Sequence, residues 1–591
     1  MCRFAIVSVL LAPVCDAEET AWNVQKREQK TSPAGLGEDI LRWHPIELAF
    51  EGPATSETAA ENPFTNYRLD VTFTCEGKAE RVRGFYAADG DAANTGAESG
   101  NVWKVRFAPR TVGTWTYSAR LVHGKDVAID TDVEGESVPI ASSRGTFKVV
   151  EPGEVTEDFR TRGFIESSEG LFRFGHSGKV WLKGGCGSPE NLLAFDGFDG
   201  TYRTLAEARE GEAAAPEDIH RYEPHVKDWQ PADPTWRGDQ GKAIIGGVNY
   251  LASQGINAQY FLTMNIGGDG KDVWPYTGPK EFERFDCSKL DQWNVLFAHM
   301  QHRGISLHMV TQETENEKLL DNGDTRRLRK LYYNELISRF AHHPALIWNL
   351  GEENGPADFS PDGQNARQQR AMASYLNKAD PYNHPIVLHS HATPASKDEI
   401  LPDLLGHKPL DGLSMQIHQP HDVHGEFLKW REASANAGHP WLLAMDEIGK
   451  WDTGLVPDSV DPAHDKLRQD VLWGSLMAGA AGVEWYFGAH YPHNDLNSED
   501  WRQRENMWRQ TAVARKFFEA HVPFDSMQPA DELTSDGDDY CLAAEGKIYL
   551  IYMKEVRENT LRLPEGSYSV HWFDPFYGGQ LRSGSVDAVV G

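Results

Sequence analysis

Cysteine is scarce in this chain, with six residues in 591. No paired spacing links Cys2, Cys15, Cys75, Cys186, Cys287 and Cys541. The sequence therefore indicates neither a disulfide framework nor a zinc site, and we expect the four cysteines beyond the first segment to be buried free thiols. Long apolar runs are missing too. Because no stretch beyond the first segment reaches the roughly 18 apolar residues of a transmembrane helix, we expect no membrane span.

Positive charge is in short supply as well. Lys and Arg number 58 against 88 Asp and Glu, which gives a net charge of -30. A protein that binds nucleic acid needs a basic surface to displace phosphate counterions, so we expect no nucleic-acid partner. The net charge also repels polyanions from the surface as a whole, but a local basic patch in a cleft would still accept a sulfated or uronic glycan.

The N-terminal segment is typical of a short export signal. Arg3 supplies a positive start, residues 4–11 are apolar, and Cys15-Asp16-Ala17 offers small residues for cleavage. We therefore expect residues 1–17 to be a signal peptide and the mature protein to be secreted or periplasmic. The sequence gives no indication of the oligomeric state.

The length exceeds what one hydrophobic core supports, so several domains are expected. Residues 40–151 predict a β-sandwich, because apolar residues alternate with polar ones between turns rich in Gly and Asp. Leu69, Val71 and Phe73 show this period of two. Residues 523–591 return to strand patterns and predict a small C-terminal β-domain, which we expect to be incomplete at Gly591.

Residues 155–522 predict a (β/α)₈ barrel, which makes the fold class α/β. Eight short apolar runs alternate with helical segments, as parallel βα units require. The runs are Val180–Lys183, Ala258–Thr263, Ser306–Val310, Ala345–Asn349, Ile386–Leu388, Gly412–Gln416, Trp441–Met445 and Gly482–Tyr486. A doubly wound sheet is the alternative, but no Gly-rich phosphate turn follows the first run.

Polar or aromatic side chains follow most of these runs, and catalytic groups of such barrels lie at the C-terminal ends of the strands. The candidates are Asn265, Glu313, Glu315, Glu352, Glu353, His389, His391, Gln416, His418, Asp446, Glu447, Glu484 and Trp485. Carboxyls after strands four and seven would face each other across the barrel mouth, and glycoside hydrolysis needs two carboxyls flanking one bond. The histidines also suggest a metal. Because no further ligands complete a tetrahedral spacing, we favour hydrogen bonds to substrate and expect no metal or cofactor.

Two motifs carry a resemblance to a known family. Trp348-Asn349-Leu350-Gly351-Glu352-Glu353-Asn354 resembles the strand-four motif of the retaining glycoside hydrolases of clan A, and Leu442-Leu443-Ala444-Met445-Asp446-Glu447-Ile448-Gly449 resembles their strand-seven motif. The resemblance implies that Glu353 is the acid/base and Glu447 the nucleophile. It also implies that Trp485 is the aromatic platform under the reactive sugar, and that His418 lies near the nucleophile.

One position departs from the clan pattern. Where the clan usually has Asn before the acid/base, in contact with the sugar 2-hydroxyl, this chain has Glu352. Either Glu352 makes that contact, or the register is shifted and Glu352 is itself the acid. We favour Glu353.

The whole chain also resembles a narrower group of bacterial secreted proteins. These have an N-terminal β-sandwich, a clan-A-like barrel and a C-terminal domain labelled as collagen-binding. Segments 184–191, 199–202 and 268–275 look characteristic of the group. The last segment contains Trp274, which we expect to bind substrate together with Asn265, Glu313, His389, His418 and Trp485. The resemblance implies a reaction class and leaves the sugar open.

We therefore expect a retaining glycoside hydrolase that acts on a poly- or oligosaccharide by double displacement. A non-catalytic carbohydrate-binding or adhesion protein on a barrel scaffold is the alternative, and a metal-dependent hydrolase that uses the histidines is a third hypothesis. The insertion at residues 206–236, after strand one, is expected to wall off one side of the cleft.

Overall fold

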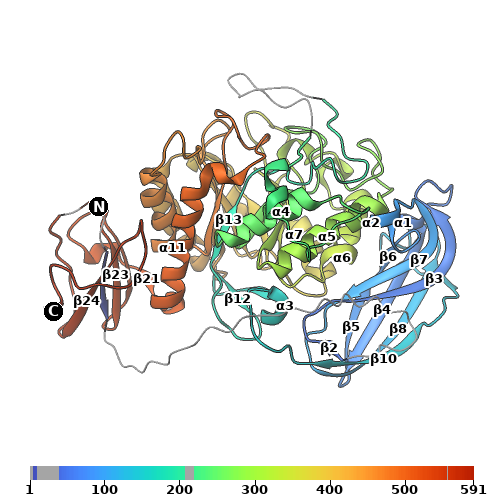
Figure 1. Cartoon of the computed structure of the whole chain (residues 1–591), viewed down its shortest axis with the longest axis horizontal. Coiled ribbons are helices and arrows are strands. Elements are labelled where there is room, and N and C mark those ends of the chain that lie inside the picture. Colours follow the sequence, from blue (N-terminus) through green and yellow to red (C-terminus); the bar gives the residue numbers. More distant parts are fainter. Residues whose placement is uncertain (1–3, 9–38, 206–218, 556) are drawn as a thin grey trace.

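The computed structural model describes residues 4–8, 39–205, 219–555 and 557–591. Three bodies lie in a row (Figure 1): a β-sandwich at one end, a barrel wrapped in helices in the centre, and a small β-sheet domain at the other end. Helix α11 (Glu505–His521) stands between the barrel and the C-terminal sheet. The predicted α/β class, with a barrel flanked by two β-domains, is confirmed.

The N-terminal sandwich buries aromatic side chains between two sheets. The Phe73 and Phe107 rings stack with their centroids 4.0 Å apart, one from each sheet. The first sheet contains β2 (Ile40–Leu41), β4 (Tyr67–Cys75), β5 (Lys78–Arg83), β8 (Gly113–His123), β9 (Glu136–Val138) and β10 (Arg144–Val150), and the second contains β3 (Ile46–Ser56), β6 (Phe85–Tyr86) and β7 (Ser99–Phe107). Short helices α1 (Pro63–Asn66) and α2 (Ala92–Thr95) lie in the connections.

Eight parallel strands close the central barrel, and they correspond to the eight predicted runs. In barrel order they are β13 (Lys183–Cys186), β14 (Ala258–Leu262), β15 (Ser306–Val310), β16 (Leu346–Asn349), β17 (Ile386–His389), β18 (Gly412–Ile417), β19 (Leu442–Ile448) and β20 (Gly482–Trp485). The first strand begins at Lys183, later than predicted. The reason is that Trp181 N–H donates to Phe172 O (2.9 Å), so this stretch extends the hairpin of β11 (Ile165–Ser168) and β12 (Leu171–Phe174).

Helices cover the outside of the barrel. Besides α11 they are α3 (Phe159–Arg162), α4 (Lys242–Ser253), α5 (Cys287–His302), α6 (Arg327–Phe340), α7 (Ala366–Ala379), α8 (Pro394–Ile400), α9 (Val423–Asn436) and α10 (Gly474–Met477). Local sequence sets their starts: Asn365 and Gln368 form a capping box at the start of α7. Among the residues that the structure describes, no helix combines the length and apolar character needed to cross a bilayer.

The C-terminal sheet contains β21 (Gln528–Pro529), β22 (Tyr540–Ala544), β23 (Ile548–Tyr552), β24 (Ser567–Phe573) and β25 (Ala588–Val590). Strand β1 (Phe4–Ser8) pairs antiparallel with both β23 and β24. The other residues of the expected signal peptide, 1–3 and 9–17, lie outside the described residues. The four described cysteines, Cys75, Cys186, Cys287 and Cys541, are buried and unpaired, as expected.

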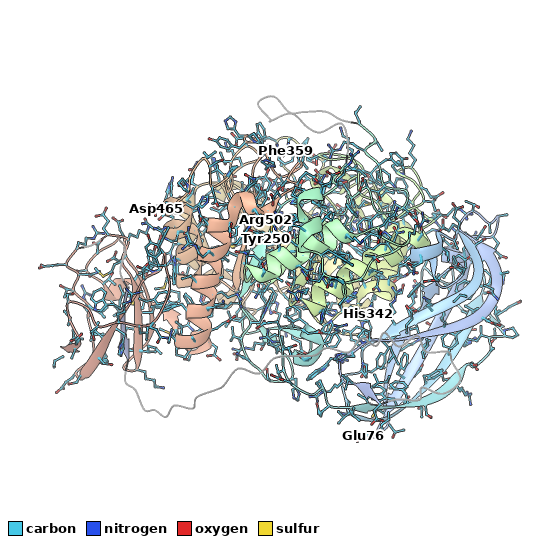
Figure 2. All side chains as sticks on the ribbon, viewed as in Figure 1. Glu76, Tyr250, His342, Phe359, Asp465 and Arg502 are labelled. Atoms are coloured by element: carbon cyan, nitrogen blue, oxygen red, sulfur yellow. The ribbon has the colours of Figure 1, made fainter. Side chains whose placement is uncertain are left out.

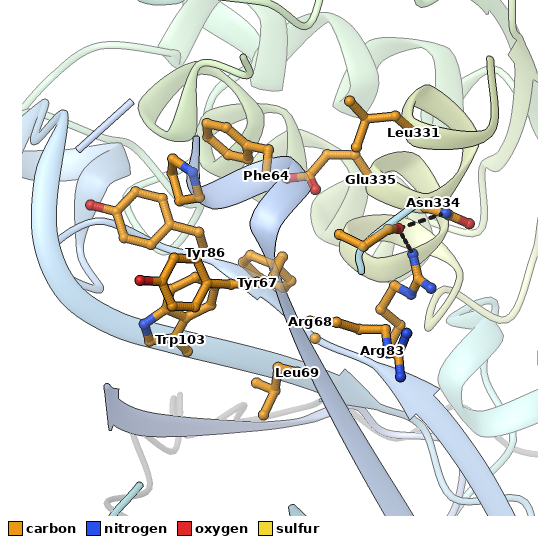
Figure 3. Close-up of a pocket in the computed structure, with 14 residues that line it drawn as sticks. Phe64, Tyr67, Arg68, Leu69, Arg83, Tyr86, Trp103, Leu331, Asn334 and Glu335 are labelled. Carbon is orange, nitrogen blue, oxygen red and sulfur yellow. Dashed lines mark hydrogen bonds between the residues drawn. The ribbon is translucent and has the colours of Figure 1, made fainter. Parts of the chain in front are cut away.

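Polar contacts join the sandwich to the barrel. A narrow pocket of about 20 Å³ lies at this junction. Arg83 and Asn334 both donate to Ala128 O beside it (Figure 3). Nearby, Arg106 Nη2 donates to Asp291 Oδ1 of α5 (2.9 Å). Because both ion-pair partners are almost fully buried, the sandwich is fixed to the barrel wall and not merely tethered to it.

Candidate active site

A cavity of about 830 Å³ opens where the barrel strands end at their C-termini. Nine carboxylate side chains line it: Glu190, Asp269, Glu313, Glu315, Glu352, Glu353, Asp358, Glu399 and Glu447. Lys450 is the one lysine in this lining, which contains no arginine among the described residues. Phe359, also in the lining, is 59% exposed and projects from the face of the barrel that carries the long loops (Figure 2). The cavity is therefore strongly acidic.

Glu447 reaches the cavity because strand β19 is irregular. Met445 pairs with Met415, but the next pair joins Glu447 to Gln416, so Asp446 is an extra residue. Such a bulge changes the direction in which the following side chain points. Gln416 Nε2 donates to Glu447 Oε1 (2.6 Å) and fixes the carboxylate.

His389 lies beneath Glu447 as a neutral imidazole. Burial holds the pKa of His389 well below its usual range. Its Nδ1 accepts the backbone N–H of Glu353 (3.1 Å), so the ring proton must be on Nε2. That nitrogen lies 3.4 Å from Glu447 Oε2. His389 therefore links the chain at Glu353 to the carboxylate of Glu447.

The two strand-four glutamates have different surroundings. Thr314 donates its hydroxyl to Glu352 Oε2 (3.0 Å). Burial, followed by the charges of Glu353 and Glu447, raises the pKa of Glu352 well above its usual range. A carboxylate oxygen of Glu352, a ring nitrogen of His389 and a carboxylate oxygen of Glu447 all lie within 4.8 Å of one another. A buried carboxyl with a raised pKa remains protonated and can donate a hydrogen bond.

Glu353 adopts a strained backbone conformation, with φ of 38°. Left-handed backbone at a non-glycine residue costs about 1–3 kcal/mol and is concentrated at functional sites. Oε2 of Glu353 lies 4.0 Å from His391 Nδ1. The other ring nitrogen of His391 donates to Gly355 O (3.1 Å), so in the neutral ring Nδ1 carries a lone pair. A protonated Glu353 therefore faces a hydrogen-bond acceptor.

An ionic cluster fills the barrel interior below these residues. Lys183 Nζ contacts Asp446 Oδ1 (2.5 Å) and Glu484 Oε2 (3.0 Å). Burial raises the pKa of both carboxyls, and Lys183 opposes that effect. His308 Nδ1 donates to Glu484 Oε2 (2.7 Å). Burial and the Lys183 charge lower the pKa of His308 to about 3, so the ring is neutral.

The cluster is connected to the loop after strand β16 through one amide. His308 Nε2 accepts from Asn349 Nδ2 (3.1 Å). The Asn349 oxygen in turn accepts the backbone N–H groups of Gly351 and His389, each at 3.2 Å. The loop that carries Glu352 and Glu353 is therefore positioned by charges buried inside the barrel.

Of the expected substrate-binding residues after strands two and three, Glu313 lines the cavity. Asn265 is fully buried, and its side-chain oxygen accepts the N–H groups of Asp272 (3.1 Å) and Val273 (2.8 Å), so it shapes the loop. Trp274 is 1% exposed and packs edge-on against Tyr202. Neither Asn265 nor Trp274 is among the described lining residues.

The expected residues after strands six and eight lie outside the lining too. His418 Nε2 is 3.0 Å from Gln419 Nε2. Trp485 is fully buried and donates its indole N–H to Thr511 of α11 (2.9 Å). Adjacent side chains of a strand point to opposite sides, so the next residue, Tyr486, lines the cavity instead, together with Trp451.

The described part of the insertion, residues 219–236, contributes nothing to the cavity lining. It packs against α4, where a Cβ on Gly246 would lie 2.0 Å from His225 O. Residues 206–218 lie outside the described residues. The expectation that the insertion walls off the cleft therefore has no support from its described part.

Sequence reasoning missed Glu190, Lys183 and His308. Each lies in or directly after a barrel strand, and a lone Lys or His within an apolar run is the signal that could have found the latter two. Three groups have the geometry of a cation site: His308, Asp446 and Glu484; Glu352, His389 and Glu447; and Glu190, Asp269 and Glu313. In the first group, the Lys183 ammonium already supplies the positive charge.

Comparisons with known proteins agree with this architecture. A family model described as "Domain of unknown function (DUF5060)" matches residues 39–121. No curated protein matches the chain. A crystal structure of a "putative glycoside hydrolase" from Bacteroides vulgatus ATCC 8482 is 16% identical with a TM-score of 0.55, and the match covers 86% of this chain and 84% of that chain. A structure named "Glycoside hydrolase" is 12% identical with a TM-score of 0.51, covering 74% and 93%. At these identities, the likeness shows a shared fold.

Proposed function

We propose that this protein is a retaining glycoside hydrolase that acts on an oligo- or polysaccharide. The observation that carries the proposal is the convergence of strand-four and strand-seven carboxyls on one cavity at the C-terminal face of the barrel. The names of the two similar structures point to the same reaction class. Trp451 and Phe359 add exposed aromatic rings to the lining, and such rings stack well on sugar faces.

In the proposed reaction, Glu447 attacks the anomeric carbon while Glu353 gives its proton to the leaving oxygen. The glycosidic C–O bond breaks and a covalent glycosyl-enzyme forms. Glu353, now a carboxylate, takes a proton from water, and the resulting hydroxide attacks the same carbon and releases Glu447. No step needs a cofactor.

We assign the acid/base role to Glu353 and a sugar-contacting role to Glu352. Glu352 is held by the Thr314 hydroxyl, and its raised pKa makes it a hydrogen-bond donor, as the amide of Asn would be. For Glu353, 19% of the side chain is exposed and the His391 lone pair lies beside its carboxyl, so it can reach a leaving group.

A hydrolysis screen on a glycan panel, with wild type beside Glu447→Ala, tests the proposal. We expect the wild type to release sugar and the variant to lose about 10³-fold or more. Equal activity in both proteins would show that Glu447 is not the nucleophile. Silence of both proteins across the panel, with glycan binding intact, would favour a carbohydrate-binding protein. The configuration of the first product, followed by NMR, separates retention from inversion.

A further inference from the structure

The cavity wall holds a second group of carboxylates that the proposed reaction does not use. Oxygens of Glu190, Asp269 and Glu313 lie within 4.8 Å of one another. These side chains follow strands β13, β14 and β15, whereas the reacting carboxyls follow β16 and β19. The backbone N–H of Asp269 donates to Glu313 Oε1 (2.8 Å) and holds the loop against the group.

Glu190 is the most informative member of this group. It is 7% exposed, yet its carboxylate makes no hydrogen bond or ion pair with any other described side chain, and it lines the cavity. Burial, followed by the charges of Asp495 and Glu352, raises the pKa of Glu190 well above its usual range. A buried carboxyl without a protein partner is costly, so a ligand that supplies positive charge and N–H donors would satisfy it.

The charge of the whole cavity indicates which kind of cation fits. A divalent ion would balance two of the three negative charges in one group of carboxylates. The acidic side chains, however, continue around the cavity through Glu315, Asp358 and Glu399, opposed by one lysine. A linear ligand that carries several positive charges along its length matches this distribution of carboxylates. The electrostatic potential of a cleft lined by charges of one sign also raises the local concentration of an oppositely charged substrate.

We propose that the substrate is a glycan of amino sugars with free, protonated amino groups, and that Glu190, Asp269 and Glu313 bind one of its ammonium groups. This inference rests on the proposed hydrolase function and names its substrate class. An ammonium donates three hydrogen bonds, which is one for each carboxylate of the group. Uronic and sulfated glycans are excluded from the cavity by the same charges.

Binding to an inactive variant tests the substrate class separately from catalysis. Calorimetry on Glu447→Gln compares glucosamine and galactosamine hexamers with their fully N-acetylated counterparts at low and high salt. At low salt, we expect an amino-sugar hexamer to bind at least ten-fold tighter than its N-acetylated counterpart. The difference should shrink at high salt. Adding Glu190→Gln or Glu313→Gln should remove most of the preference by weakening the binding of the amino-sugar hexamers.

The exposed Glu76→Gln, at the far end of the sandwich (Figure 2), makes the same charge change and should leave the preference intact. Absence of any preference for free amines in both pairs overturns the inference. So does a rise in Tm with Ca²⁺ that Glu190→Gln abolishes without any amine preference, which would assign the group to a metal. If amine binding holds but no glycan is cleaved, the hydrolase proposal fails alone; if a neutral glycan is cleaved best, the substrate class fails alone.

Discussion

Asp446 and Glu447 are neighbours in β19, yet Asp446 binds Lys183 inside the barrel while Glu447 lines the cavity above it. A regular strand would point two successive side chains to opposite sides of the sheet. The bulge opposite Gln416 breaks that rule and brings both to the interior side of the barrel wall. The proposed nucleophile therefore depends on an irregularity of one residue.

The roles of Glu353 and Glu352 can be separated by the leaving group. We expect Glu353→Ala to lose about 10²–10⁴-fold on a natural glycan, because general acid catalysis contributes that much. On an aryl glycoside with a good leaving group the loss should be small, and azide should accelerate turnover by replacing the activated water. Steady-state kinetics with and without azide provides the measurement.

Glu352→Ala is the matched comparison for that experiment. A residue that only contacts the sugar should lose activity to the same extent on both kinds of substrate, and azide should not rescue it. Rescue of Glu352→Ala in place of Glu353→Ala would reverse the two assignments.

Gln416 is expected to act as a positioning residue for Glu447. Removing its side chain in Gln416→Ala leaves the carboxylate without its 2.6 Å donor. A displaced nucleophile costs on the order of 10²-fold in rate, so kcat should fall while KM stays within about two-fold. The exposed Gln230→Ala should change neither constant. A rise in KM with unchanged kcat would instead assign Gln416 to substrate binding.

Lys183 is expected to be essential to stability. Lys183→Met leaves two buried carboxyls, Asp446 and Glu484, without their cation, and breaking a buried pair in this way costs about 3–5 kcal/mol. The pKa of each carboxyl is already raised by burial, so the folded variant binds more protons than the unfolded chain. Its stability should therefore recover as the pH falls from 7 toward 5, measured by urea denaturation.

The exposed Lys547→Met is the control for Lys183→Met and should stay within about 0.5 kcal/mol of wild type. Equal stabilities of the two variants would show that the cluster does not need its cation.

Glu57 should make the stability of the junction between sandwich and barrel fall as the pH rises through neutrality. It is 4% exposed, and its Oε1 accepts the N–H of Cys287 at the start of α5 (2.7 Å). Burial, followed by the charge of Asp286, raises the pKa of Glu57 from 4.5 to about 8. Between those values the folded state binds more protons than the unfolded state, so stability falls as pH rises, by at most about 1.4 kcal/mol per pH unit.

Glu57→Gln keeps an oxygen acceptor and removes the titration. We expect its free energy of unfolding to fall less steeply than that of wild type between pH 6 and 8, whereas Glu76→Gln should keep the wild-type slope. Identical slopes for wild type and Glu57→Gln would show that Glu57 is ionised in the folded protein.

The strand pattern predicted the barrel because each strand is buried on both faces and is therefore a short apolar run. Strand ends then placed Glu353 and Glu447 in one cavity, since parallel strands end on the same face. The start of β13 was placed too early because Val180 and Trp181 are just as apolar as a barrel strand, but belong to the hairpin before it.

The finer features of the site depend on contacts between distant residues. Trp485 looked like the aromatic platform, but its neighbour Tyr486 lines the cavity, because a shift of one residue reverses the direction of a side chain. Lys183 and His308 gave only weak local signals. Their role exists only once a closed barrel brings them together with Glu484, which no periodicity in the sequence encodes.

The ionic cluster in the barrel can form only in the last steps of folding. Lys183 is separated from Asp446 by 263 residues and from Glu484 by 301. At a synthesis rate of about 5–20 residues per second, the lysine emerges roughly 15–60 s before its second partner exists. Its charge cannot organise the nascent chain during that interval. Apolar packing must bring the first and last strands together. The Lys183 ion pairs then stabilise the barrel after it has closed.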